Sequence, residues 1–135
     1  RVEIIRLREA FDLDRPAFRK KWARKESALR RKIQAAREQL DDVDTPAMLL
    51  ETAAKLCLAL GTDGLRGELT LVRSARALAA LEGKSAATLK HLRAMAPSVL
   101  RHRLRRDPLD ESSADIRVER VIAEFFKESV DDGGN

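Results

Sequence analysis

Apolar residues recur at intervals of three and four along most of the chain, which is the spacing of amphipathic α-helices. The first such stretch covers residues 1–11 and the second covers residues 15–40, where Asp14 and Pro16 form a typical helix start. The apolar stripe of the second stretch is narrow, so we expect a long, charged helix that packs along one seam. The seam consists of Phe18, Trp22, Leu29, Ile33, Ala36 and Leu40.

The periodicity stops at residues 40–46 and resumes in residues 46–128, which predicts a bundle of four more helices. We expect Thr45 to cap the first of them with Pro46 at its first helical position, Thr88 to cap the third and Ser113 the last. Gly61 and Gly83 are the expected stops of the first two helices. The second should be the central helix because it is apolar over a wide arc, and residues 129–135 should form a flexible tail. The expected core positions are Leu49, Ala53, Leu56, Cys57, Leu60, Leu69, Leu71, Val72, Ala75, Leu78, Ala79, Leu81, Leu92, Met95, Ala96, Val99, Leu100, Ile116, Val121, Ile122, Phe125 and Phe126.

Composition supports a single all-α domain of about five to six helices. Of the 135 residues, 44% are hydrophobic, 36% are charged and only 4% are aromatic. No apolar run is long enough to cross a bilayer, and nothing resembles a signal peptide, so we expect an interior compartment. The single Cys57 fits a reducing compartment and should be a buried structural thiol. The chain begins with Arg1 inside a helical pattern, which suggests a piece of a longer protein.

The net charge of +5 is concentrated in two clusters. Solvated helix faces and a surface for an anionic partner are both compatible with them. The clusters are Arg19, Lys20, Lys21, Arg24, Lys25, Arg30, Arg31 and Lys32 in the first third, and Arg101, Arg103, Arg105 and Arg106 later.

The sequence offers one candidate site, which is an arginine at the start of a helix. It contains no phosphate loop, no zinc-type spacing and no serine elbow, and His91 and His102 stand too far apart to share a metal, so we expect no metal site. Arg66 lies between Gly64 and Gly67. A phosphate there would accept bonds from helix amides and the guanidinium, whereas a salt bridge to Glu68 is the simpler alternative.

Four segments are similar to a known family over essentially the whole chain. They read RVEIIR at residues 1–6, GLRGELTL at 64–71, RSARALAALEG at 73–83 and HRLRRDPLDE at 102–111. The sequence resembles the C-terminal part of the AAA+ ATPase subunit, subunit I, of magnesium chelatases. The resemblance implies a helical lid domain over residues 1–128, with residues 1–11 as first lid helix, 15–40 as a long insertion and 46–128 as the sensor-2 bundle.

By the same resemblance, Arg66 is the sensor-2 arginine that reaches the γ-phosphate of ATP, with Gly64 and Gly67 allowing close backbone approach. ATP and Mg²⁺ would be cofactors of the longer protein, with none expected on this piece alone, which should be inactive without the phosphate-binding core. The expected partners are further copies in a ring, the companion AAA+ subunit of the chelatase and its porphyrin-binding subunit, with neither membrane nor nucleic acid. The implied reaction inserts Mg²⁺ into protoporphyrin IX for chlorophyll or bacteriochlorophyll, in the bacterial cytoplasm or plastid stroma.

Three alternatives remain open from the sequence. The lid of the companion AAA+ subunit follows a related core, but that subunit continues into an acidic, proline-rich linker that does not begin here. A cobalt chelatase lid is the second. The third belongs to another class, a basic helical module that binds nucleic acid through the two arginine- and lysine-rich clusters, although the sequence shows no helix-turn-helix signature.

Overall fold

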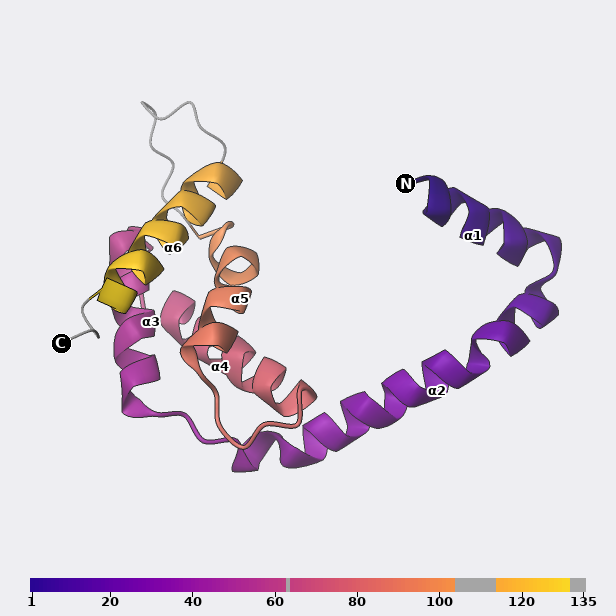
Figure 1. The fold of residues 1–135 in the computed structure, drawn as a ribbon, viewed down its shortest axis with the longest axis horizontal. Helices are drawn as coiled ribbons and strands as arrows, with labels where there is room; N and C mark the ends of the chain where they lie inside the picture. Colours follow the sequence, from indigo (N-terminus) through magenta and orange to yellow (C-terminus); the bar gives the residue numbers. More distant parts are fainter. Residues whose placement is uncertain (63, 104–113, 132–135) are drawn as a thin grey trace.

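The computed structural model describes residues 1–62, 64–103 and 114–131, and every regular element among them is a helix. Helices α3 to α6 form a bundle, whereas α1 and α2 form an arm that extends away from it, so the molecule has the outline of a crescent (Figure 1). The expectation of an all-α fold is confirmed.

The arm is a helical hairpin made of α1 (Val2–Leu13) and α2 (Arg15–Gln39). Asp14 separates the two helices and caps α2, because its carboxylate accepts a hydrogen bond from the Ala17 amide at 3.0 Å. Phe11 meets Phe18 edge-on with 5.6 Å between ring centroids, and Trp22 follows one turn later. No residue of either helix is fully buried, so the hairpin is held by a thin layer of side chains.

The base of the arm is attached to the bundle through polar contacts. The short 3₁₀ helix η1 (Leu40–Asp42) follows α2, and the Leu40 carbonyl accepts a hydrogen bond from Nη2 of Arg76 at 2.9 Å. One isolated parallel bridge pairs Asp44 with Ala86. Ala36 and Leu40 also pack against the core. The last turn of α2 therefore belongs to the bundle, and the rest of the helix projects from it.

The sequence prediction for the start of α3 is wrong by one position. Helix α3 (Ala47–Ala59) has Pro46 as its N-cap residue, without a side-chain cap, rather than Thr45. The backbone of Asp44 makes two hydrogen bonds with the segment before α5. Its amide donates to the Ser85 carbonyl, and its carbonyl accepts from the Ala87 amide. This pairing keeps the chain extended through Pro46, whose ψ is 144°, so the helix begins one residue later.

The bundle is organised around α4 (Arg66–Leu81), which packs against α2, η1, α3 and α5 (Leu89–Leu100). Helix α6 (Ala114–Asp131) closes the bundle over α5 and α3 and extends beyond residue 128.

The prediction of a central helix is confirmed, as are Thr88 as N-cap of α5 and the glycine stops at Gly61 and Gly83, both with positive φ. Ser113 lies outside the described residues. The buried core consists of Val43, Leu49, Ala53, Leu56, Cys57, Leu60, Leu71, Ala75, Ala79, Ala80, Ala87, Leu92, Ala96, Leu100, Val118, Ile122 and Phe126.

Two predicted core positions are wrong for the same reason. Leu69 is 52% exposed and Ile116 is 59% exposed. Each stands two residues before a buried side chain, Leu71 and Val118 respectively, and two residues on a helix correspond to about 200° of rotation. Both side chains therefore point away from the face that their neighbours bury.

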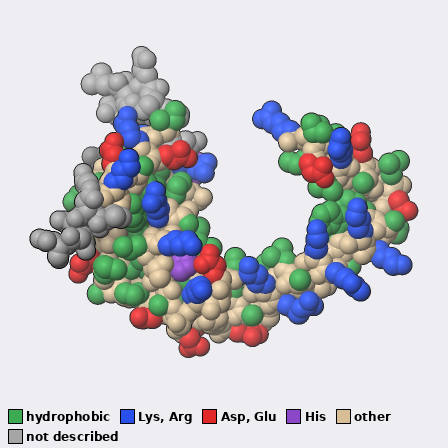
Figure 2. Space-filling view, viewed as in Figure 1, with side chains coloured by type: hydrophobic (Ala, Val, Ile, Leu, Met, Phe, Trp, Pro, Cys, Tyr) green, Lys and Arg blue, Asp and Glu red, His purple; other side chains and the backbone are tan. Residues whose placement is uncertain are grey.

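Charge is distributed unevenly over the molecule. Lys and Arg side chains are spread along the arm, with fewer acidic ones between them (Figure 2). Within the described residues, the helices are too short or too polar for any of them to pass through a lipid bilayer.

Candidate anion-sensing site

The loop between α3 and α4 reverses the chain through two glycines in the left-handed region. Gly61 (φ 67°) ends α3, where the amides of Gly61 and Thr62 donate to the carbonyls of Leu58 and Cys57 at 3.0 and 3.1 Å. Gly64 (φ 70°) makes the second turn. Residues with a Cβ adopt such φ values only with strain. The loop thus delivers the chain to the first turn of α4 beside the end of α3.

Arg66 is the first residue of α4, and its side chain is exposed. The N-cap residue Leu65 provides no side-chain bond to the first-turn amides of α4. Among the ion pairs of the described residues, none involves Arg66. The alternative salt bridge from Arg66 to Glu68 is not among the ion pairs of the described residues, and Oε2 of Glu68 is buried there without a hydrogen-bond partner. An exposed guanidinium next to amides without a side-chain cap suits an oxyanion such as phosphate.

Gly67 is buried where α4 meets the neighbouring helices. A Cβ at this position would lie 3.4 Å from Oγ1 of Thr62, 3.7 Å from Sγ of Cys57 and 3.8 Å from Cδ2 of Leu100. The start of α4 therefore lies close to α3 and α5, with room at this position for no more than a methyl group, and this packing places Arg66. A Cβ on Gly64 would have nothing within 4 Å. A role for either glycine in approaching a ligand stays a prediction.

Cys57 lies below this loop as a buried free thiol, as the sequence predicted. Burial raises the pKa of the thiol above its ordinary value of 9.0, which outweighs the opposing hydrogen bond from Thr62. The side chain remains protonated and unreactive at neutral pH, so Cys57 is part of the packing under the site.

The other basic residues are dispersed. Arg73 is exposed on α4, whereas Arg76 is partly buried at the base of the arm. In the late cluster Arg101 is exposed and Arg103 is partly exposed. Arg105 and Arg106 lie outside the described residues. Arg66 is thus the cation that the loop geometry singles out, and the basic clusters do not converge on it in the described part of the molecule.

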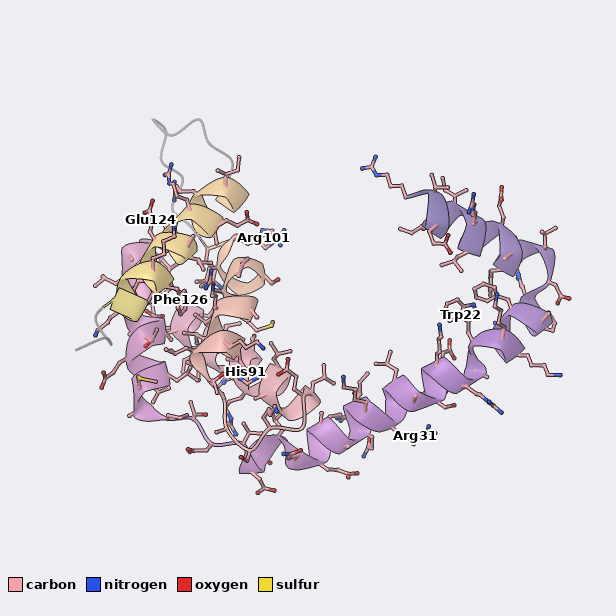
Figure 3. The ribbon with its side chains drawn as sticks, in the orientation of Figure 1. Trp22, Arg31, His91, Arg101, Glu124 and Phe126 are labelled. Atoms are coloured by element: carbon pink, nitrogen blue, oxygen red, sulfur yellow. The ribbon has the colours of Figure 1, made fainter. Side chains whose placement is uncertain are left out.

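The two histidines occupy different environments. His91, labelled in Figure 3, is buried, with Nδ1 bonded to the Thr88 amide and Nε2 2.9 Å from Oε2 of Glu82. His102 is exposed. In residues 1–62, 64–103 and 114–131, no group of three or more His, Cys, Asp or Glu side chains is arranged to hold a metal ion.

Sequence reasoning missed an apolar surface beside Arg66. Leu65 immediately precedes Arg66 and is 75% exposed. Leu69 follows Arg66 by about one helical turn and is 52% exposed. The signal was available, because Leu69 does not share the face of Leu71 and Ala75 in a regular helix. A guanidinium between exposed leucines suits a position that meets another protein surface as well as an anion.

Comparison with known proteins identifies the fold. The sequence matches the family described as the AAA lid domain over residues 50–124, which is more than half of the chain. The chain belongs to the AAA lid domain family. The match includes the loop, all of α4 and α5, and most of α3 and α6, so Arg66 lies inside the recognised domain.

The arm is included in the similarity to longer proteins. The magnesium-chelatase 38 kDa subunit of Acidiphilium rubrum is 56% identical over 129 residues, which are 96% of this chain and 37% of the relative. The subunit of the same name from Cereibacter sphaeroides is 53% identical over 126 residues, or 93% of this chain and 38% of the relative. The chloroplastic magnesium-chelatase subunit ChlI of Oryza sativa subsp. indica is 37% identical over 93% of this chain and 30% of the relative. The chain therefore spans between 30% and 38% of the length of these relatives.

Proposed function

We propose that this chain is the C-terminal helical lid of the ATP-hydrolysing motor subunit of a magnesium chelatase, and that Arg66 senses the γ-phosphate of ATP. The observation that carries the proposal is the position of Arg66, exposed and without an ion pair in the described residues, at the first turn of the central helix of an AAA lid domain. The names of the relatives supply the metal, since both are magnesium-chelatase subunits. The resemblance of the sequence implies the acceptor, so the proposed reaction is insertion of Mg²⁺, the substrate ion, into a porphyrin.

The residues of the site fit a triphosphate. The Arg66 guanidinium can donate two parallel hydrogen bonds to phosphate oxygens, and the amides at the start of α4 carry the positive end of the helix dipole. ATP with its Mg²⁺ would supply the hydrolysable γ-phosphoryl group. No phosphate-loop lysine occurs in this sequence, so the core that binds and cleaves ATP belongs to the longer protein, and this piece alone should be inactive.

The sensing mechanism follows from a difference in charge. Arg66 gains a strong interaction only while the γ-phosphate is present, so ATP favours one lid position and hydrolysis weakens that preference. The start of α4 packs closely against α3 and α5 at Gly67, so we expect the Arg66 guanidinium and the bundle to move together. The lid thereby converts the charge of a phosphate into a displacement.

The assembly around the lid is also part of the proposal. We expect a homo-oligomeric ring of the longer subunit, working with a companion AAA+ subunit and a porphyrin-binding subunit in the bacterial cytoplasm or plastid stroma. A chloroplastic relative supports the plastid stroma as one of these compartments.

The test is Arg66→Ala in the longer protein that contains this chain. We expect ATP turnover to fall about 10²-fold, as after removal of one positioned donor to a developing charge, with fold and oligomeric state unchanged. Phosphate release measures turnover, and sedimentation measures assembly. The matched control is Arg73→Ala, an exposed arginine on the same helix, which should keep near-normal turnover. Normal turnover in Arg66→Ala would refute the sensor assignment.

A further inference from the structure

One face of α2 carries an apolar seam that is covered at both ends and bare in the middle. Phe18, Trp22, Leu29, Ile33, Ala36 and Leu40 fall within about 60° of arc on a helix of 3.6 residues per turn. At one end, Phe18 contacts Phe11 of α1. At the other end, Ala36 and Leu40 pack against the bundle core. Between them, Leu29 and Ile33 are 56% and 45% exposed.

The bare section faces the concave side of the crescent. Trp22, on the same seam, points toward the inside of the arm, whereas Arg31, about 200° away from Leu29, lies on the outside (Figure 3). Ile4 is 68% exposed and continues the face of α1 that carries Leu7 and Phe11 toward α2. We call Ile4, Leu29 and Ile33 the inner face of the arm.

A row of lysines borders this face. Lys21, Lys25 and Lys32 are exposed and lie within about 60° of the seam on one flank of α2. None of them takes part in an ion pair among the described residues, and Nζ of Lys25 lies 4.6 Å from the centroid of the Trp22 ring. Basic side chains far outnumber acidic ones on the whole helix: Arg15, Arg19, Lys20, Lys21, Arg24, Lys25, Arg30, Arg31, Lys32 and Arg37 stand against Glu26 and Glu38.

We propose that the inner face of the arm binds an acidic, amphipathic helix of another protein chain. A single apolar seam of this width matches one partner helix, whose leucine-like side chains would cover Leu29 and Ile33. Carboxylates on the flank of that helix would meet Lys21, Lys25 and Lys32. The partner's chemistry is thus an apolar stripe bordered by Asp or Glu.

The composition of the face favours a separate chain that binds reversibly. A permanent contact, such as packing against another part of the same protein, is more apolar than a surface in which Leu29 and Ile33 lie beside lysines. A second copy of α2 would bring like charges together. Nucleic acid would leave Leu29 and Ile33 uncovered, because its charges would be met equally well by Arg31 on the outside.

The experiment uses the 135-residue chain and a synthetic helical peptide of about five turns, with leucines at helical spacing and glutamates on the flanks. Calorimetry at low salt should detect binding of this peptide, and replacement of its glutamates by glutamine should weaken binding. Ile33→Asp and Lys32→Glu should each weaken it by about tenfold or more, since both place like charges in the contact. Circular dichroism verifies that each variant is folded.

The matched control is Arg31→Glu, which makes the same charge change one residue away on the outer side. It should change affinity by less than about threefold if position on the inner face decides binding. Equal losses in Arg31→Glu and Lys32→Glu, or no binding of the acidic peptide, would overturn the proposal.

Other occupants give distinct results, and each would overturn the proposal. A DNA duplex that binds more tightly than the peptide and is indifferent to Ile33→Asp would identify a nucleic-acid surface. Self-association of the chain that is lost in Ile33→Asp would identify a second copy. If the Ile33→Cys thiol is protected from a maleimide in the longer protein purified alone, a segment of the same protein covers the inner face. None of these outcomes depends on Arg66, so the sensor proposal stands or falls separately.

Discussion

Gly64 and Gly67 flank Arg66 for two different physical reasons. Gly64 has a φ of 70°, which a residue with a Cβ adopts only with strain, although the space around it is open. Gly67 is helical and buried, and the nearest atoms to an added Cβ lie at 3.4 Å or more, which is ordinary van der Waals contact. One glycine is required by backbone conformation, and the other permits close packing with room for one methyl group.

These reasons predict opposite effects of the same substitution. Gly64→Ala should lower the free energy of unfolding by about 1 kcal/mol, because the left-handed conformation is strained for alanine. Gly67→Ala should raise it by about 0.5 kcal/mol, because alanine is the better helix former. Urea denaturation of the 135-residue chain measures both. A Gly67→Ala variant that is clearly less stable than the parent would contradict the packing described for α4.

The same pair separates packing from ligand approach. If Gly67→Ala is stable and the longer protein still loses ATP turnover, the position is needed for close approach of the nucleotide, as the resemblance implied. Unchanged turnover would leave Gly67 with its packing role alone.

At the scale of the element, α5 begins with a histidine in the cap. Nδ1 of His91 accepts a hydrogen bond from the Thr88 amide at 2.9 Å, which places the ring proton on Nε2. That proton is donated to Oε2 of Glu82 at 2.9 Å. The buried side chain of His91 thus joins the end of α4 to the start of α5.

Because of this cap, we expect the free energy of unfolding to fall as the solution becomes acidic. The hydrogen bond from His91 holds the pKa of Glu82 below its ordinary value of 4.5. A lowered pKa in the folded state means that the contribution to stability is present above pH 4.5 and is lost as the pH falls below it. In Glu82→Gln the amide oxygen still accepts from Nε2, so we expect near-parent stability at neutral pH and a shallower loss toward acid.

Thermal unfolding measured from neutral pH down to about pH 3.5 checks this expectation, because carboxylates titrate within that range. The control is Glu51→Gln, at an exposed position of α3 away from the cap. An acid-side slope of Glu82→Gln equal to that of the parent would show that this carboxylate does not couple to folding.

Local signals in the sequence predict some element boundaries and fail at others. A threonine before a periodic stretch predicts Thr88 as a cap, and it is the cap. The same signal at Thr45 fails, because the pairing of Asp44 with Ala86, a contact between distant segments, keeps Thr45 and Pro46 outside the helix. Arg66 stands out from its neighbours in sequence alone, whereas the exposed Leu65 beside it becomes evident only once the turn is placed. Tertiary contacts decide what periodicity leaves open.

At the scale of the whole molecule, the crescent depends on how α2 leaves the bundle (Figure 1). Helix α2 has 25 residues, about 37 Å in length, and only its last turn contacts the core. That turn is held by the 2.9 Å hydrogen bond from Arg76 to the Leu40 carbonyl and by a bond from Gln39 to the Lys84 carbonyl at 3.2 Å. Arg76 lies on α4, about 15 Å along the helix from Arg66. One helix therefore carries both the proposed sensor and a hydrogen bond that holds the base of the arm.

Arg76→Met tests whether that contact fixes the arm. Methionine keeps most of the apolar stem of the side chain but cannot donate to Leu40, so we expect stability to fall by about 1 kcal/mol. We also expect the arm to sample a wider range of angles.

Electron spin resonance between nitroxides on Lys20→Cys and Glu51→Cys measures the distance distribution from α2 to α3. Native Cys57 can stay in place, because it is buried and the pKa of its thiol is raised, so it reacts slowly. The distribution should broaden in Arg76→Met but not in Arg73→Met, which changes an exposed arginine on the same helix. Equal widths in both variants would mean that packing of Ala36 and Leu40 alone sets the direction of the arm.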